Sequence, residues 1–163
     1  MSRMGRFDSS QLRKLQANLD KLQDANVDAF CEACAKELAA RLLAKVIKRT
    51  PVGQYPSGSG KKGGTLRRGW TSQKGLGSEG LNTRSASQFV DTLRVNHFGN
   101  TYVIEIVNPV EYASYVEYGH RTRNHSGWIS GQFMMTISEQ EIQTIAPRVL
   151  ENKLKKFLGG AFQ

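Results

Sequence analysis

The sequence predicts an α+β fold, with long N-terminal helices and a C-terminal helix packed on a small antiparallel β-sheet. Three observations support it: a leucine stripe of helical period near the N-terminus, a longer helical pattern after it, and two runs of alternating polarity in the middle. The length of 163 residues and the 39% hydrophobic content suit one domain. We expect a single domain over residues 1–163, with residues 1–26 as an N-terminal helical extension and flexible loops at residues 51–64 and 74–87.

Two helices are expected in the N-terminal third. Residues 9–23 repeat leucine at steps of three and four, which places Leu12, Leu15, Leu19 and Leu22 on one stripe, with Asp8, Ser9 and Ser10 as capping candidates. A longer helix is expected over residues 27–48. Its inward positions are Val27, Phe30, Cys31, Cys34, Leu38, Leu42 and Val46. Thr50 ends it, because the residue before Pro51 is disfavoured in helical geometry.

Strands are expected in the middle of the chain. Residues 65–73 form the weakest candidate because Gly69 interrupts the pattern. Residues 88–96 form a second. Residues 101–108 alternate clearly, with Tyr102, Ile104 and Ile106 on one side and Val103, Glu105 and Val107 on the other. The short connection at residues 97–100 predicts an antiparallel hairpin between the last two strands.

The C-terminal part reads as two helices joined by a loop. A short helix is expected over residues 111–118, ended by Gly119, and a loop follows from His120 to Gly131. A final helix is expected from about residue 133 to 158. Ser138 and Glu141 have the spacing of a capping box, and Pro147 is expected to kink or divide the helix.

Positive charge is concentrated in one segment. The chain has 23 Lys and Arg against 14 Asp and Glu, a net charge of +9, and nine of the basic residues lie between Leu38 and Ser78, where no acidic residue occurs. Such a patch favours an acidic partner, either a nucleic-acid backbone or an acidic protein surface, and the charge does not choose between them. The candidate partner-facing or DNA-facing residues are Lys61, Lys62, Arg67 and Arg68.

Motifs for catalysis or cofactors do not emerge. The GSGKKGG stretch lacks the first glycine and the Ser or Thr of a phosphate loop. Cys31 and Cys34, with His120 and His125, match the ligand types of a zinc site. However, about 85 residues separate the cysteine pair from the histidine pair, whereas zinc-site pairs are usually separated by about a dozen residues. The favoured interpretation is therefore that the cysteines are buried apolar residues. No histidine or carboxylate pair has the setting of a general acid or base. We therefore expect no enzyme, no cofactor, no metal and no membrane partner.

Aromatic residues lie within or near the basic positions: Tyr55, Trp70, Tyr112, Tyr115, Tyr118 and Trp128. Such residues can stack bases, form protein interfaces or simply fill a core.

Three stretches carry a family resemblance: TLRRGW at residues 65–70, YASYVEYGHRTR at 112–123 and GWISGQFMMTISEQEI at 127–142. Together they resemble the neck or tail-completion family of long-tailed bacteriophages, also labelled tail component or head–tail joining protein, with relatives in prophages and phage-tail-like particles. The similarity runs from Val27 onward, and the Y-x-x-Y-V-E-Y-G turn is its most specific part.

The resemblance implies a structural virion protein assembled in the bacterial cytoplasm. It would form a homo-oligomeric ring at the head-proximal end of the tail, where its partners are other copies, the tail terminator or tail tube, the head connector and, where the ring is threaded, DNA. Within this hypothesis the candidate subunit interface is Tyr115, Glu117, Tyr118 and Arg121, since Tyr, Arg and charge at a glycine-ended turn suit a specific polar contact. The alternative is a nucleic-acid-binding module that uses the basic segment.

Overall fold

The computed structural model describes residues 13–14, 16–17, 20, 27–71 and 85–161. Its elements follow in the order α2 (Val27–Arg49), α3 (Thr65–Gly69), α4 (Ala86–Asp91), β1 (Asn96–Phe98), β2 (Thr101–Val103), α5 (Ala113–Tyr118), β3 (Gly119–Arg121), β4 (Trp128–Ser130) and α6 (Met134–Ala161). This mixture of long helices and short antiparallel strands confirms the predicted α+β class. The strands form two separate two-stranded hairpins instead of one sheet.

The predicted helix over residues 9–23 is described only in part. Residues 13–14, 16–17 and 20 are helical and exposed. The leucine stripe and the capping candidates Asp8, Ser9 and Ser10 lie outside the described residues.

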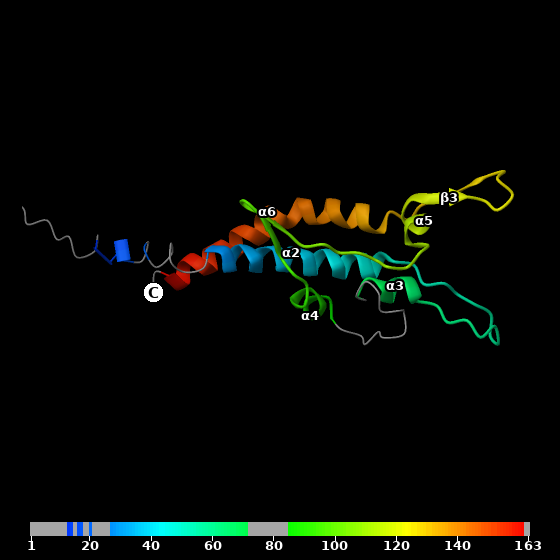
Figure 1. Cartoon of the computed structure of the whole chain (residues 1–163), viewed down its shortest axis with the longest axis horizontal. Coiled ribbons are helices and arrows are strands. Elements are labelled where there is room, and N and C mark those ends of the chain that lie inside the picture. The colour runs from blue at the N-terminus through cyan, green and yellow to red at the C-terminus, as the bar shows by residue number, and fades with distance from the viewer. Residues whose placement is uncertain (1–12, 15, 18–19, 21–26, 72–84, 162–163) are drawn as a thin grey trace, which may run out of the picture.

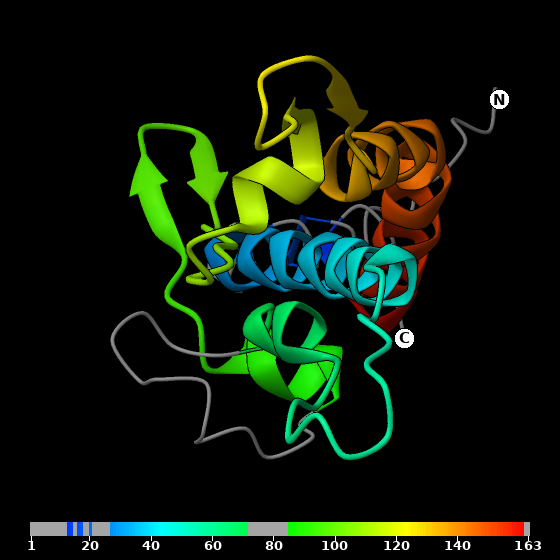
Figure 2. The same ribbon diagram turned by 90° about the vertical axis from the view of Figure 1, so that its right-hand side faces the viewer.

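The two long helices, α2 and α6, lie side by side and run in opposite directions (Figures 1 and 2). Polar contacts pair the end of α2 with the start of α6, through Arg49 Nη2 and Glu141 Oε1 at 2.7 Å. Near the other end, the rings of Phe30 and Phe157 stack with centroids 4.5 Å apart. Between them Lys153 Nζ lies 3.1 Å from Glu37 Oε2. The pair is therefore held along its length.

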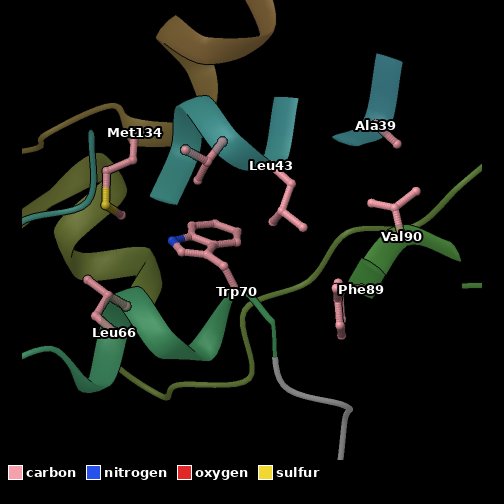
Figure 3. Packing of buried hydrophobic residues seen from close by; sticks show 8 residues of the cluster. Ala39, Leu43, Leu66, Trp70, Phe89, Val90 and Met134 are labelled. Atoms are coloured by element: carbon pink, nitrogen blue, oxygen red, sulfur yellow. The ribbon is translucent and has the colours of Figure 1, made fainter. Parts of the chain in front are cut away.

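The helix α2 confirms the predicted bounds to within one residue. Its most buried residues are Ala39, Leu43 and Val46, which follow at steps of four and three and point into the cluster drawn in Figure 3. The expected inward position of Val27 is wrong, because this residue opens the first turn and is 50% exposed. The buried face lies in the C-terminal half of the helix, where α3, α4 and α6 surround it (Figure 2).

The weak strand expected at residues 65–73 is a short helix, α3, followed by Trp70. Gly64 has a left-handed φ of 92° and opens the turn, and Leu66, Gly69 and Trp70 are buried. Gly69 does not weaken a strand here. A Cβ at this position would collide with Asn108 Oδ1, so glycine permits a close approach of two segments.

The strand expected at residues 88–96 is also wrong in its first half, which forms α4. Ser85 caps this helix: its Oγ accepts from the Gln88 backbone N–H, and the Gln88 side chain accepts from the Ser85 N–H. Phe89 and Val90 are buried against the core. The last residues of the loop expected at 74–87 thus belong to this helix and its cap, and residues 74–84 lie outside the described residues.

A hairpin forms in this region, as β1 and β2, each of three residues. β1 shares only Asn96 with the strand expected at residues 88–96, and His97 and Phe98, expected in the connection, are paired in β1. Gly99 and Asn100 form the turn, with a left-handed φ of 61° at Gly99. The hairpin is fixed to the start of α2 because Tyr102 Oη donates to Asp28 Oδ1 at 2.6 Å. The strand pairing stops at Val103, well before the expected end at residue 108.

The C-terminal part confirms α5 and α6 and corrects three details. Residues 120–131, expected as a loop, contain β3 and β4, paired with Arg121 opposite Trp128. Pro147 lies inside α6, which continues through it undivided. The capping box at Ser138 is wrong, because α6 begins at Met134, and the Ser138 hydroxyl is buried and donates to the Met134 carbonyl at 2.6 Å.

Candidate assembly surface

The YASYVEYG stretch separates its side chains into an inward and an outward set. In α5, Glu117 is 6% exposed, whereas Tyr115 is 59% and Tyr118 is 64% exposed. Gly119 ends the helix with a φ of 86° and is the first residue of β3. The short helix therefore turns a carboxylate into the protein and two phenol rings towards the outside.

Glu117 caps the long helix α6 from outside its own sequence. Its two carboxylate oxygens accept the backbone N–H groups of Met135, at 2.9 Å, and of Thr136, at 3.0 Å, and the Thr136 hydroxyl donates to it at 2.8 Å. These amides belong to the first turn of α6, where backbone donors have no partner within the helix and the helix dipole favours a negative charge. Glu117 is thus an intramolecular cap, and its carboxylate does not face a partner.

The β3–β4 hairpin is joined to α5 by backbone contacts that leave no room for side chains. The Gln132 N–H donates to the Val116 carbonyl at 2.7 Å. A Cβ at Gly131 would collide with the Glu117 carbonyl oxygen, and one at Gly119 with the carbonyl oxygen of Ile129. Glycine at both positions allows α5, the hairpin and the start of α6 to form one close-packed unit.

This unit lies at one end of the molecule (Figure 1). It carries a set of exposed large side chains. We call the set the aromatic surface; its members and exposed fractions are Tyr115 59%, Tyr118 64%, Trp128 61%, Ile129 50% and Phe133 42%. Arg121 is exposed and lies opposite Trp128 in the hairpin register. Aromatic residues with an arginine are the composition typical of interface centres. Three of the four predicted interface residues, all but Glu117, are therefore exposed on α5 and β3.

Three cations of the basic segment are neutralised within the chain. Lys45 and Arg49 both lie 2.7 Å from Glu141, and Arg41 lies 2.8 Å from Glu37. The carboxylates respond to these cations: the Lys45 hydrogen bond holds the pKa of Glu141 below its ordinary value near 4.5. The sequence pattern missed this, because the partner of Lys45 and Arg49 on α6 is more than 90 residues away.

The four predicted DNA-facing or partner-facing residues divide into two kinds. Arg67 points inward, where its guanidinium donates twice to the Thr50 carbonyl, at 3.1 and 2.6 Å. Arg68 is exposed and donates to the Gly63 carbonyl at 3.3 Å. Lys61 and Lys62 are exposed on the loop at residues 51–64 and have no ion pair among the described residues. Lys61 Nζ lies 5.9 Å from the centre of the Tyr55 ring.

The cysteines and histidines of the zinc hypothesis are spread over different elements. Cys31 and Cys34 are free thiols in α2, and burial raises the pKa of Cys34. His120 lies in β3, and His125 lies in the turn after it. Within the part of the chain that the structure describes, no three His, Cys, Asp or Glu side chains come together as metal ligands would. The described helices also include none with the length and apolar character needed to cross a bilayer.

The comparison with protein families gives a match over residues 13–119, to a family described as "Bacteriophage HK97-gp10, putative tail-component". The match covers more than half of the chain, from before α2 to the glycine that ends α5. It starts earlier than the similarity expected from Val27 onward and does not include residues 127–142. No curated protein and no solved structure gives a match. The chain therefore belongs to the HK97 gp10-like family of bacteriophage tail components.

Proposed function

We propose that this tail component is a structural protein of the neck, part of a tail-completion ring at the head-proximal end of the tail. Copies of the chain form a homo-oligomeric ring that joins the tail tube or tail terminator to the head connector or to a cap. The observation that carries this proposal is the aromatic surface, since large exposed patches of this kind on a folded chain mark sites of protein association.

The proposed subunit contact uses Tyr115, Tyr118 and Arg121 together with Trp128. Their backbone is held before any partner arrives, because Glu117 fixes the start of α6 and two glycines bring the hairpin against α5. Ordering a surface in advance lowers the entropy lost on association. In a ring of identical subunits, this lower entropy loss applies to every subunit contact.

The loop at residues 51–64 is proposed to reach towards a neighbouring ring or towards DNA in the lumen. Its base is anchored, since Thr50 at one end is buried and Leu66 just after the other end is buried too. Lys61 and Lys62 lie on the exposed part between them. Cations not neutralised within the chain are suited to phosphate groups or to acidic residues of an adjoining protein.

A double variant, Tyr118→Ala with Trp128→Ala, tests the proposal. It should leave the unfolding midpoint in urea nearly unchanged, because both side chains are about 60% exposed. It should reduce incorporation into tail particles and self-association in analytical ultracentrifugation. Phe98→Ala is the matched control, because Phe98 is an equally exposed aromatic residue (68%) on the β1–β2 hairpin.

Particles provide the second part of the test. Bacteria that produce the phage or tail-like particle without this chain should yield tails that fail to join heads or that lack their head-proximal end in electron micrographs. Complete, normally joined particles in its absence would refute the proposed function. Normal incorporation of the double variant would refute the proposed surface alone.

A further inference from the structure

An extended segment of the chain lies on the core without a strand partner. After β2 ends at Val103, the exposure of the residues continues to alternate up to Val110: Val103, Glu105 and Val107 are exposed, and Ile104 and Ile106 are half-buried against the core. This two-residue period is that of a β-strand lying on a hydrophobic core. Figure 1 shows the segment running beside α2 from the β1–β2 hairpin to α5.

The backbone of residues 104–107 makes no hydrogen bond within the part of the chain that the structure describes. Backbone N–H and C=O groups in folded proteins are nearly all paired, with protein or with water. An extended, unpaired backbone is a template for another strand. We call residues 104–107 the open segment.

The β3–β4 hairpin has the complementary properties. Among the strands that the structure describes, β4 pairs with β3 alone, and all three of its residues are exposed. Trp128 and Ile129 in β4 are 61% and 50% exposed. An isolated two-stranded hairpin is only marginally stable, and the outer edge of β4 has no strand partner among the described residues. The open segment and the outer edge of β4 could therefore each accept one adjacent strand.

Charge favours this hairpin as the partner of the open segment. Glu105 is exposed in the middle of the open segment and has no ion pair among the described residues. Arg121 in β3 and Arg123 just after it are exposed and likewise have no carboxylate partner in the described chain. Pairing two open segments with each other about a two-fold axis would instead bring one Glu105 close to the other, and like charges on neighbouring strands are destabilising.

We propose that the open segment of one copy accepts the β4 edge of the β3–β4 hairpin of the next copy, forming a sheet across the subunit boundary. This inference rests on the proposed ring, and it names the two surfaces that meet. Because donor and acceptor are different parts of the chain, the contact is head-to-tail. Such contacts repeat around a closed ring, whereas a two-fold contact would end at a dimer.

The first test removes one backbone donor. Val107→Pro replaces an exposed residue whose N–H has no partner in the described chain, so the subunit itself loses no hydrogen bond. Proline blocks strand addition. We expect self-association in sedimentation experiments, and incorporation into particles, to fall by about tenfold or more. The control Val107→Thr keeps the N–H and the strand preference, and it should associate like the parent.

The second test exchanges charges. Glu105→Arg and Arg121→Glu should each weaken association, and the double variant should recover a large part of it, because the attraction is restored in reverse. Equal association of Val107→Pro and Val107→Thr would overturn the inference, as would a double variant no better than either single one. If these variants assemble normally while Tyr118→Ala with Trp128→Ala does not, the pairing fails and the proposed ring stands. Normal particles without the protein refute the ring itself.

Discussion

The indole N–H of Trp70 donates to the hydroxyl of Thr50 at 2.7 Å, and this contact joins the end of α2 to the end of α3. The same hydroxyl donates to the Val46 carbonyl at 2.7 Å, and the Thr50 carbonyl accepts from Arg67. Figure 3 shows the Trp70 ring between Leu66, Leu43 and Met134. The basic loop at residues 51–64 therefore leaves and re-enters the fold at one buried polar junction.

Thr50→Val should test this junction directly. Valine has nearly the shape of threonine but cannot accept the indole hydrogen bond, and Thr50 is fully buried. A buried donor without an acceptor costs about 1 to 3 kcal/mol, so we expect the free energy of unfolding to fall by about 2 kcal/mol in urea titrations. Thr50→Ser retains the hydroxyl and loses one methyl group, with an expected cost of about 1 kcal/mol or less. Equal losses for both variants would show that the hydroxyl contributes nothing.

Glu117→Ala should destabilise the protein through the first turn of α6. It removes the acceptor of two backbone amides and one hydroxyl at a buried site. We expect a loss of about 2 to 4 kcal/mol, with the helix signal in circular dichroism following the same transition. Glu139→Ala is the control, since Glu139 is exposed on the same helix and should change stability by less than about 0.5 kcal/mol. If the Glu117→Ala protein is as stable as the parent but does not assemble, Glu117 acts in the subunit interface and not as a helix cap.

Gly69→Ala and Gly159→Ala should have opposite effects. At Gly69 the new Cβ would collide with Asn108 Oδ1 and lie 2.8 Å from Val110 Cγ2, whereas at Gly159, inside α6, it would meet nothing within 4 Å. We expect Gly69→Ala to cost about 1 to 3 kcal/mol through overpacking. Gly159→Ala should stabilise by up to about 1 kcal/mol, because alanine favours the helix. Thermal unfolding of both variants beside the parent gives the comparison, and a neutral Gly69→Ala would contradict the close packing of α3 on Asn108.

Local sequence patterns predicted the long helices α2 and α6. α2 and α6 are long and amphipathic, and α2 ends where Pro51 requires it. Residues 101–108 alternate in exposure as expected, although the paired strand β2 covers only Thr101–Val103. α3 and α4 were missed because segments of five and six residues are too short to show a helical period. For α4 a usable signal existed, since Ser85 and Gln88 have the spacing of a capping box.

The sequence indicated which residues could face a partner, but not which of them point into the protein. The stretch at residues 112–123 contributed Tyr115, Tyr118 and Arg121 as candidate interface residues; all three are exposed, and their role in an interface stays a prediction. Glu117 and Arg67 look equally suited to a partner in the sequence, yet both are used inside the chain. Their partners lie 17 to 19 residues away and are set by packing, so no local pattern distinguishes an inward charge from an outward one.

Stability should fall at acidic pH because of Glu141. Its hydrogen bond to Lys45 and the charge of Arg49 lower the pKa of this carboxyl in the folded state from its ordinary value near 4.5. A group with a lowered folded pKa contributes its stability above the unfolded pKa and loses it as pH falls towards the folded pKa. The melting temperature should therefore decline below about pH 4.5, and less steeply for Glu141→Gln than for the parent. If the melting temperatures of the two proteins fall equally with pH, other carboxyl groups cause the loss of stability in acid.

DNA binding should depend on the exposed lysines of the loop at residues 51–64. If DNA passes this loop, the purified chain binds duplex DNA at low salt, and the logarithm of affinity falls linearly with the logarithm of salt concentration. Lys61→Gln with Lys62→Gln should reduce the magnitude of that slope by up to about 1.8, or about 0.9 for each phosphate that a lysine no longer neutralises. Arg41→Gln is the control, because Glu37 already neutralises Arg41 at 2.8 Å. Fluorescence anisotropy over a salt series measures both. An unchanged slope in the double variant would indicate that the loop contacts an acidic protein surface instead of DNA. Absence of binding at low salt would exclude the DNA contact.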